Sequence, residues 1–176
     1  TGVAPAFLKP ALDGAQRCTL LDRFKLSKPF ILYYGGFDRH KNVGRLVEAA
    51  ALTMRRLGKR FGIVLAGPIG DAQRLELERI ALLSGLALDE LQFPGFVADD
   101  DLPGLLNSCD VLVSPSLGEG FGLPVLEAMS AGAPVLCADN SSLPEVMGLA
   151  DAMFDAEDPV SMAEKLFRVL SDAQFA

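Results

Sequence analysis

The chain has 176 residues, enough for one ordinary domain but small for a complete two-domain enzyme. Half of its residues are apolar and 22% are charged, with 17 Gly and 11 Pro, which excludes a disordered, collagen-like or coiled-coil chain. Sixteen basic residues against 23 acidic ones give a net charge of −7, and no stretch concentrates positive charge. We therefore expect no nucleic-acid partner.

The cysteines and the single histidine argue against a metal site. Cys18, Cys109 and Cys137 are odd in number and far apart, unlike a disulfide framework or a zinc site. No apolar run approaches the ~20 residues of a membrane span, and the N-terminus lacks a secretory signal. These features predict a cytoplasmic protein with reduced thiols and no metal.

The pattern along the chain predicts alternating strands and helices. Residues 1–28 have the weakest pattern and are expected to form a lead-in segment. Short apolar runs predict buried strands at 30–34, 61–66, 91–93, 110–114 and 134–138, with a weak sixth strand ending at Phe154. Amphipathic spacing predicts helices at 42–57, from 71, at 102–107, at 123–131 and from 159.

Local residue choice sharpens some of these helices. Asn42 is a plausible N-cap, and the acidic run 99–101 is expected to cap the helix that follows it. The helix from 71 carries Leu75, Ile80 and Leu83 as its apolar residues.

Strands that alternate with amphipathic helices predict an α/β fold, with a parallel sheet of about six strands covered on both faces. We expect a Rossmann-like, three-layer domain that occupies the whole chain, residues 1–176. Ligands of such sheets bind beyond the carboxyl ends of the strands. The loops that meet there hold the unusual residues, at 35–41, 67–68, 95–97, 114–122 and 140–142.

A glycine-rich turn at 118–124 leads into a predicted helix. Free backbone amides at a helix N-terminus favour a phosphate, and the glycines allow its close approach. The turn is no dinucleotide fingerprint, because Leu123 stands where the third glycine belongs and the turn follows the fourth strand. The alternative is a tight turn without a ligand.

Two glutamates accompany this turn, with Glu119 in the loop and Glu127 in the helix. A carboxylate in the helix can accept the hydroxyls of a ribose, and one in the loop can stabilise positive charge at a reacting centre. Taken singly, Glu127 could instead compensate the helix dipole and Glu119 could be an exposed loop acid.

Arg39 and Lys41 place two positive charges at the start of a predicted helix, where the dipole disfavours cations. A bound diphosphate would compensate them, with Lys41 as a point charge and Arg39 as a fork. A solvated basic loop is the alternative. Phe96 and Val97 could present an apolar surface and backbone groups to a nucleobase, or belong to the core.

Five motifs follow one another along the chain: GGFDRHKN at 35–42, GFV at 95–97, EGFGLPVLEAM at 119–129, GAPV at 132–135 and LPE at 143–145. Together they resemble the carboxy-terminal domain of the group 1, or family 4, glycosyltransferases. The resemblance implies one half of a GT-B fold, in which two Rossmann-like domains enclose a cleft. It implies that this chain is the donor-binding half and that the N-terminal acceptor domain is absent from it.

The resemblance also assigns roles to residues of this chain. Glu119 corresponds to the acid beside the donor sugar, the catalytic position, and Glu127 to the acid that binds the ribose. Lys41 matches the lysine on the diphosphate. Many members have an arginine where this chain has Gly36, and we expect Arg39 to supply that charge. The resemblance further implies donor contacts by Val97 and by the amides of Phe121, Gly122 and Leu123. Gly36, Gly67, Phe96 and Gly120 are also predicted to contact the donor nucleotide.

The implied function is transfer of a hexosyl unit from a UDP- or GDP-sugar to a sugar, lipid-linked or other hydroxyl acceptor, with retention and without a metal or other cofactor. The full-length protein would be cytoplasmic, with peripheral association at the inner face of the membrane. Two alternatives remain: a sugar-nucleotide epimerase of similar fold, against which the single histidine argues, and a non-catalytic nucleotide-binding module.

Overall fold

A computed structural model describes residues 4–8, 12–27 and 29–171 of the chain. At its centre lies a six-stranded sheet, parallel throughout, in the order β3-β2-β1-β4-β5-β6. This confirms the predicted α/β class, and the predicted strands agree with the observed ones to within two residues. The strands are β1 (Phe30–Tyr34), β2 (Gly62–Ala66), β3 (Leu91–Gly95), β4 (Val111–Ser114), β5 (Val135–Ala138) and β6 (Met153–Phe154).

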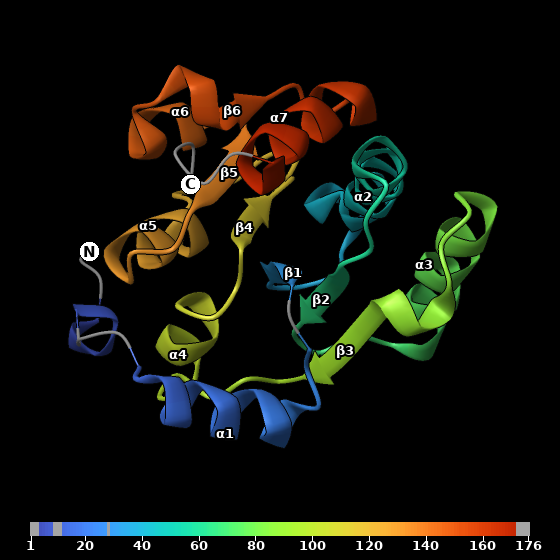
Figure 1. Ribbon diagram of the computed structural model, residues 1–176. Helices are drawn as coiled ribbons and strands as arrows, with labels where there is room; N and C mark the ends of the chain where they lie inside the picture. The colour runs from blue at the N-terminus through green and yellow to red at the C-terminus, as the bar shows by residue number, and fades with distance from the viewer. Residues whose placement is uncertain (1–3, 9–11, 28, 172–176) are drawn as a thin grey trace.

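Helices cover both faces of this sheet, giving three layers (Figure 1). One face carries α1 (Gly14–Phe24) and α4 (Leu102–Leu106), and the other carries α2 (Val43–Leu57), α3 (Asp71–Leu83) and α7 (Pro159–Ser171). The helix α5 (Leu123–Ser130) contacts β4 and β5. The short elements are α6 (Leu143–Met147), η1 (Pro5–Leu8), η2 (Arg39–Lys41), η3 (Leu88–Glu90) and η4 (Ala150–Ala152).

Side chains of β1 alternate between two apolar cores. Ile31 and Tyr33 pack with the α2, α3 and α7 layer, whereas Phe30 and Leu32 pack with α1 and α4. All four are buried, which explains why the strand has a continuous apolar sequence instead of an alternating one. The alternation also sends the adjacent side chains of Tyr33 and Tyr34 to opposite faces of the sheet.

The described part of residues 1–28, which are expected to form a lead-in segment, contains η1 and the helix α1. Asp13 and Gln16 form a reciprocal capping box at the start of α1, with hydrogen bonds of 2.8 and 3.1 Å. Within α1 the buried residues are Leu20 and Leu21, so the helix shows little amphipathic periodicity. The five-residue α6 was not predicted either, because so short a helix shows hardly more than one turn of pattern.

Two local expectations about helices are wrong. Leu75 and Leu83 are 65% and 75% exposed, because α3 contacts α2 along a narrow stripe that buries Leu77 and Ala81 instead. Asp101 stands at the N-cap position of α4, but among the described residues its carboxylate pairs with Arg23 of α1 and makes no capping hydrogen bond.

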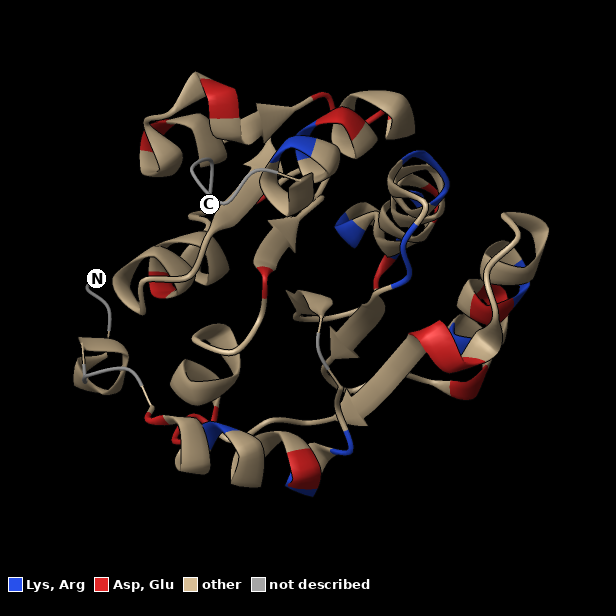
Figure 2. Cartoon of the chain, viewed as in Figure 1, with Lys and Arg blue, Asp and Glu red and all other residues tan. Residues whose placement is uncertain are grey.

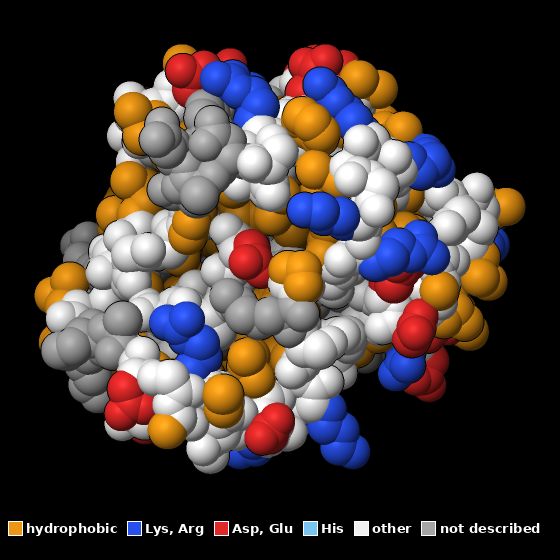
Figure 3. Space-filling model, viewed as in Figure 1, with side chains coloured by type: hydrophobic (Ala, Val, Ile, Leu, Met, Phe, Trp, Pro, Cys, Tyr) orange, Lys and Arg blue, Asp and Glu red, His pale blue; other side chains and the backbone are white. Residues whose placement is uncertain are grey.

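Charged side chains are unevenly distributed over the fold. Basic residues gather on α2 and in the segment that leads from it to β2, whereas acidic residues are spread over several elements (Figure 2). On the face shown in Figure 3, both kinds are interspersed with apolar side chains. Arg56 of α2 lies 3.9 Å above the ring of Phe167, so part of this basic cluster helps to join α2 to α7.

The strand order reverses between β1 and β4. From β1 the chain winds outward to β2 and β3, then returns to place β4 on the other side of β1. The amide of Phe30 donates to the Asp110 carboxylate at 2.7 Å, which ties the starts of these two strands together. Because the loops after β1 and β4 diverge at their carboxyl ends, a crevice is expected between them.

The carboxyl ends of β1, β2 and β3 touch through backbone. The amide of Gly35 donates to the carbonyl of Ala66 at 3.0 Å, and the amide of Gly67 donates to the carbonyl of Gly95 at 2.8 Å. A Cβ atom on Gly67 would lie 2.0 Å from the carbonyl oxygen of Gly35, at a φ of +134°. Only glycine allows this contact.

Replacing Gly67 by alanine should therefore lower the free energy of unfolding by roughly 2 kcal/mol or more, since backbone strain and overlap each cost of order 1–3 kcal/mol. Chemical denaturation measures the loss. Gly14→Ala is the control, because nothing lies within 4 Å of its added methyl group and its stability should be unchanged or slightly raised. Equal stability of the two variants would contradict the close approach.

Candidate functional site

A cavity of about 310 Å³ opens at the carboxyl ends of β1 and β2. Four of the predicted site residues line it: Gly67, Phe96, Val97 and Glu127. Phe96 is 75% exposed, whereas Val97 is buried in the core beside α4. The Phe96 ring is therefore available to a ligand, and the alternative of core packing holds for the Val97 side chain.

The carboxylate of Glu127, on α5, accepts a hydrogen bond from the hydroxyl of Tyr34 at the end of β1. Burial and this hydrogen bond raise the pKa of Tyr34 above its usual value, so the phenol stays protonated. Both residues line the cavity. Since a carboxylate has about four lone-pair positions, Glu127 keeps acceptor capacity for a ligand.

Lys41 and Glu119 form an ion pair beside this cavity, with 2.7 Å between Nζ and Oε1. The hydroxyl of Ser116 donates to the same oxygen at 2.6 Å. Burial raises the pKa of the Glu119 carboxyl, but the hydrogen bonds from Lys41 and Ser116 outweigh burial and lower the pKa below its ordinary value. The acid is thus held ionised, although the sequence alone allowed an unpaired loop carboxylate.

The ion pair lines a second cavity of about 30 Å³, which also includes Tyr33 and Pro124. Tyr34 and Gly35 line both cavities. The two cavities are therefore neighbours at the point where the strand order reverses.

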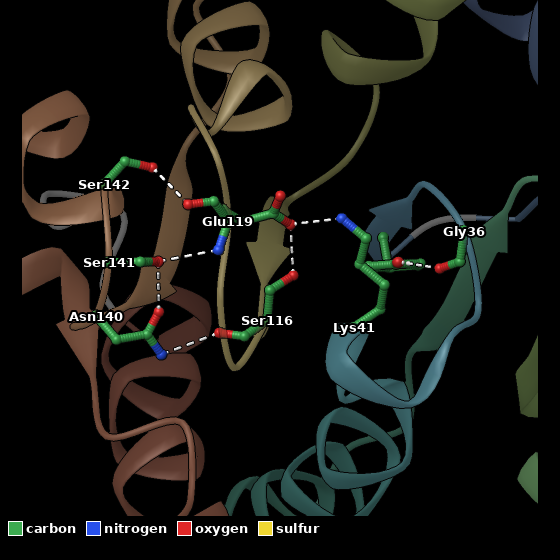
Figure 4. A network of polar contacts seen from close by, with 8 residues as sticks. Gly36, Lys41, Ser116, Glu119, Asn140, Ser141 and Ser142 are labelled. Atoms are coloured by element: carbon green, nitrogen blue, oxygen red, sulfur yellow. Dashed lines mark hydrogen bonds and ion pairs between the residues drawn. The ribbon is translucent and has the colours of Figure 1, made fainter.

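The backbone of the glycine-rich loop is held by the loop after β5 (Figure 4). The amide of Glu119 donates to the hydroxyl oxygen of Ser141 at 2.9 Å, and the hydroxyl of Ser142 donates to the carbonyl of Glu119 at 3.1 Å. Asn140 donates to the carbonyl of Ser116 at 3.0 Å. These three contacts fix the backbone on which the Glu119 side chain stands.

Gly122 ends this loop with a φ of +81°, and a Cβ atom there would lie 2.8 Å from Leu143. It occupies the N-cap position of α5, which begins at Leu123. The side chains of Phe121 and Leu123 are 46% and 39% exposed, so they flank the start of the helix without filling the core. Gly120 has open space around its Cα.

Six predicted residues line neither cavity: Gly36, Arg39, Gly120, Phe121, Gly122 and Leu123. Arg39 is exposed in η2 and lines an open groove of about 800 Å³ between α2 and α3. Gly36 accepts a hydrogen bond from the hydroxyl of Tyr33 through its carbonyl. Lys41 is thus the cation that reaches Glu119, while a role for Arg39 stays a prediction.

Asn42 occupies the N-cap position of α2, as predicted, but its side chain makes no capping hydrogen bond among the described residues. The residue has a left-handed φ of 60°. Its buried amide nitrogen donates instead to the carbonyls of Pro115, at 2.9 Å, and Ala156, at 2.7 Å. The residue therefore joins the loops that follow β1, β4 and β6.

Sequence reasoning missed several residues that line the larger cavity. Tyr34 ends a correctly predicted strand, so its place at the carboxyl edge could have marked it. Phe7 of η1 could not be found in this way, because it reaches the cavity by tertiary packing of a segment without pattern. Ala4, Ala6, Ala66, Asp99 and Leu102 also line the cavity and were missed.

Within the described ranges, no group of three or more His, Cys, Asp or Glu side chains is placed to hold a metal ion. Over the same residues, no helix has the length and apolar character needed to cross a membrane.

The chain matches the family described as "Glycosyl transferases group 1" over residues 22–176. It belongs to this family. The resemblance predicted from the five ordered segments is thereby confirmed, and the observed six-stranded parallel sheet is that of a GT-B Rossmann-like domain.

Among curated relatives, the serotype-specific mannosyltransferase WbdA of Escherichia coli is 40% identical over 157 residues. The O-antigen chain mannosyltransferase B of the same species is 34% identical over 162 residues, or 90% of this chain and 41% of the relative. The WbdA match covers 89% of this chain but 19% of WbdA, so this chain spans about a fifth of that relative's length.

Solved structures show the same fold. The C-terminal domain of the group 1 glycosyltransferase LpcC from Francisella tularensis is 26% identical, with a TM-score of 0.80, and the match covers 99% of this chain and 90% of that one. HepE of Anabaena, solved in complex with UDP, has a TM-score of 0.83 at 20% identity over 99% of this chain and 47% of its own, and it supports the fold alone.

Replacing Asn42 by alanine should lower the free energy of unfolding by about 2–4 kcal/mol, because two carbonyls lose their donor and alanine must adopt a left-handed φ. Asn42→Gly should be about 1 kcal/mol more stable than Asn42→Ala, since glycine tolerates this φ. Urea denaturation of both variants separates the two effects. A loss below about 0.5 kcal/mol in both would show that Asn42 does not join these loops.

Proposed function

We propose that this chain is the nucleotide-sugar-binding domain of a glycosyltransferase that transfers a hexosyl unit to a hydroxyl acceptor. One observation carries the proposal: the cavity lined by Glu127 and Phe96 adjoins the Lys41–Glu119 ion pair at the carboxyl edge of the sheet. An N-terminal domain, outside this chain, would bring the acceptor sugar or lipid-linked sugar. Membership of the glycosyltransferase family supports this assignment.

The larger cavity is the proposed nucleoside site. Glu127 would accept hydrogen bonds from the ribose hydroxyls, which are donors that a carboxylate binds well. The exposed ring of Phe96 would cover the base. The 310 Å³ of the cavity is at the lower end of the range of small-molecule sites, in agreement with one nucleoside.

The diphosphate would lie across the smaller cavity, next to the start of α5. Lys41 would turn from Glu119 to the phosphate oxygens, and the amides of 121–123 would donate to them. Arg39 would supply a second positive charge from η2. In this arrangement protein groups neutralise the leaving group, and we propose that neither a metal ion nor another cofactor takes part.

Glu119 would lie beside the donor sugar. As the bond to the diphosphate breaks, positive charge develops on the sugar ring, and a fixed carboxylate stabilises it. The hydrogen bonds between the Glu119 backbone and the side chains of Ser141 and Ser142 keep this charge in place. We propose that transfer retains the anomeric configuration, as the family resemblance implies.

For the donor we propose a class of nucleotide sugars and not a single compound. Relatives named as mannosyltransferases favour a mannosyl donor, and HepE, with its UDP complex, shows that this fold accepts a uridine nucleotide in one protein. We therefore propose a UDP- or GDP-hexose as donor and a glycan or lipid-linked sugar as acceptor, with a nucleotide titration to decide between the bases.

One nucleoside diphosphate among UDP, GDP and ADP should raise the stability of the 176-residue chain by ~2.7 kcal/mol at a hundred times its Kd. Thermal unfolding in the presence of each nucleotide measures this. Lys41→Ala should weaken binding of the nucleoside diphosphate by roughly 1.5–3 kcal/mol and leave the affinity for the uncharged nucleoside unchanged. Addition of EDTA should change neither of these two affinities. Failure of all three nucleotides would contradict the proposed function.

In a two-domain enzyme that carries this chain, the two glutamates should separate by role. Glu127→Gln should raise KM for the donor, whereas Glu119→Gln should lower kcat by about 10²-fold or more with nucleotide affinity within a few-fold of wild type. Steady-state kinetics of both variants, with a sugar donor of the nucleotide that binds, measures these changes in KM and kcat. An unchanged kcat in Glu119→Gln would show that Glu119 takes no part in the chemical step.

A further inference from the structure

One contact in the larger cavity has no role in the proposed function so far: it joins Tyr34 to Glu127. The Tyr34 hydroxyl donates to Glu127 Oε2 across 93 positions of sequence. Tyr34 belongs to the central strand β1, and Glu127 belongs to α5, which packs on the neighbouring strands β4 and β5. The contact therefore links two rigid elements at the wall of the proposed nucleoside site.

The two partners differ in what they can do alone. A glutamate side chain has three rotatable bonds and loses much freedom when it is fixed, whereas a tyrosine has two and a flat, packed ring. Tyr34 is partly buried and packs against the apolar core that includes Phe7 and Leu32, so its ring is anchored independently of Glu127. An anchored donor can hold a flexible carboxylate in one rotamer before a ligand arrives.

The chemistry of the pair fits a positioning role. Tyr34 remains protonated, because burial and the adjacent carboxylate raise its pKa, so it can only donate to Glu127 as the pair stands. One carboxylate oxygen is then engaged while acceptor positions remain for two adjacent hydroxyl groups.

Tyr33 offers a natural comparison within the same strand. It points to the opposite face of the sheet and donates to the carbonyl of Gly36, not to a carboxylate. The chain has two tyrosines, so each hydroxyl can be removed singly by substitution with phenylalanine.

We propose that Tyr34 is a positioning residue that presents the Glu127 carboxylate to the ribose, and that it thereby sets the preference for a ribonucleotide over its deoxy analogue. This inference rests on the proposed function, in which Glu127 binds the ribose. It adds a residue that acts through Glu127 and does not itself touch the reacting atoms.

The test measures a ratio of affinities with the 176-residue chain. Calorimetry gives Kd for UDP or GDP, whichever binds more tightly, and for its 2′,3′-dideoxy analogue. The wild type should prefer the ribonucleotide by at least about tenfold, as hydrogen bonds to a charged acceptor imply. Tyr34→Phe should reduce this preference by about fivefold, the scale of one hydrogen bond, with the affinity for the dideoxy analogue unchanged.

Three further variants make the readout specific. Tyr33→Phe should keep the wild-type ratio: its hydroxyl bonds to Gly36 on the other face, and any effect of this residue on the smaller cavity applies equally to both nucleotides, which carry the same diphosphate. Glu127→Gln should abolish the preference, and adding Tyr34→Phe to it should have no further effect, since the positioned group is already lost.

The outcomes separate the two proposals. A wild-type ratio in Tyr34→Phe, together with a lost preference in Glu127→Gln, would overturn the role of Tyr34 and leave the proposed function standing. An equal weakening of both nucleotides by Tyr34→Phe would show a merely structural role. If the wild-type chain bound no nucleotide, the proposed function and this inference would fail together.

Discussion

The reversal of strand order at β1 is the constraint on which the site depends. Because β2 lies on one side of β1 and β4 on the other, the loops that follow these strands leave in different directions. Lys41 comes from one loop and Glu119 from the other, and their ion pair spans the gap. A sheet wound in a single direction would not bring these two segments face to face.

The sequence allowed prediction of the sheet, its main helices and the edge that holds the site, because strand burial and helix periodicity are local signals. It could also mark Lys41, whose positive charge is unfavourable at the start of a helix, and Glu119 and Glu127, which match acidic positions of the family that the chain resembles. It could not show that Lys41 and Glu119 pair, or that Asn42 joins three loops, because such contacts depend on how distant segments meet. For the same reason the sequence could place Asn42 at the N-cap of α2 but could not show which groups its side chain binds.

Family membership indicates the class of reaction but not its substrates. The match over residues 22–176 favours a transferase over the epimerase that the same fold could serve. The chain covers 19% of WbdA, so most of that relative's length has no counterpart in it. The cavities and the Lys41–Glu119 ion pair all lie within this domain. They therefore bear on how the donor is bound, and the choice of acceptor is not addressed by them.

The position of η1 matters for where this domain can be cut and joined to another. Phe7 is 4% exposed, packs in the core that includes Tyr34, and lines the larger cavity, although the family match begins at residue 22. A chimera with its junction at that boundary would remove one wall of the cavity and uncover apolar surface under α5. Exchange of donor domains between enzymes of this family therefore has to carry the preceding helical turn along.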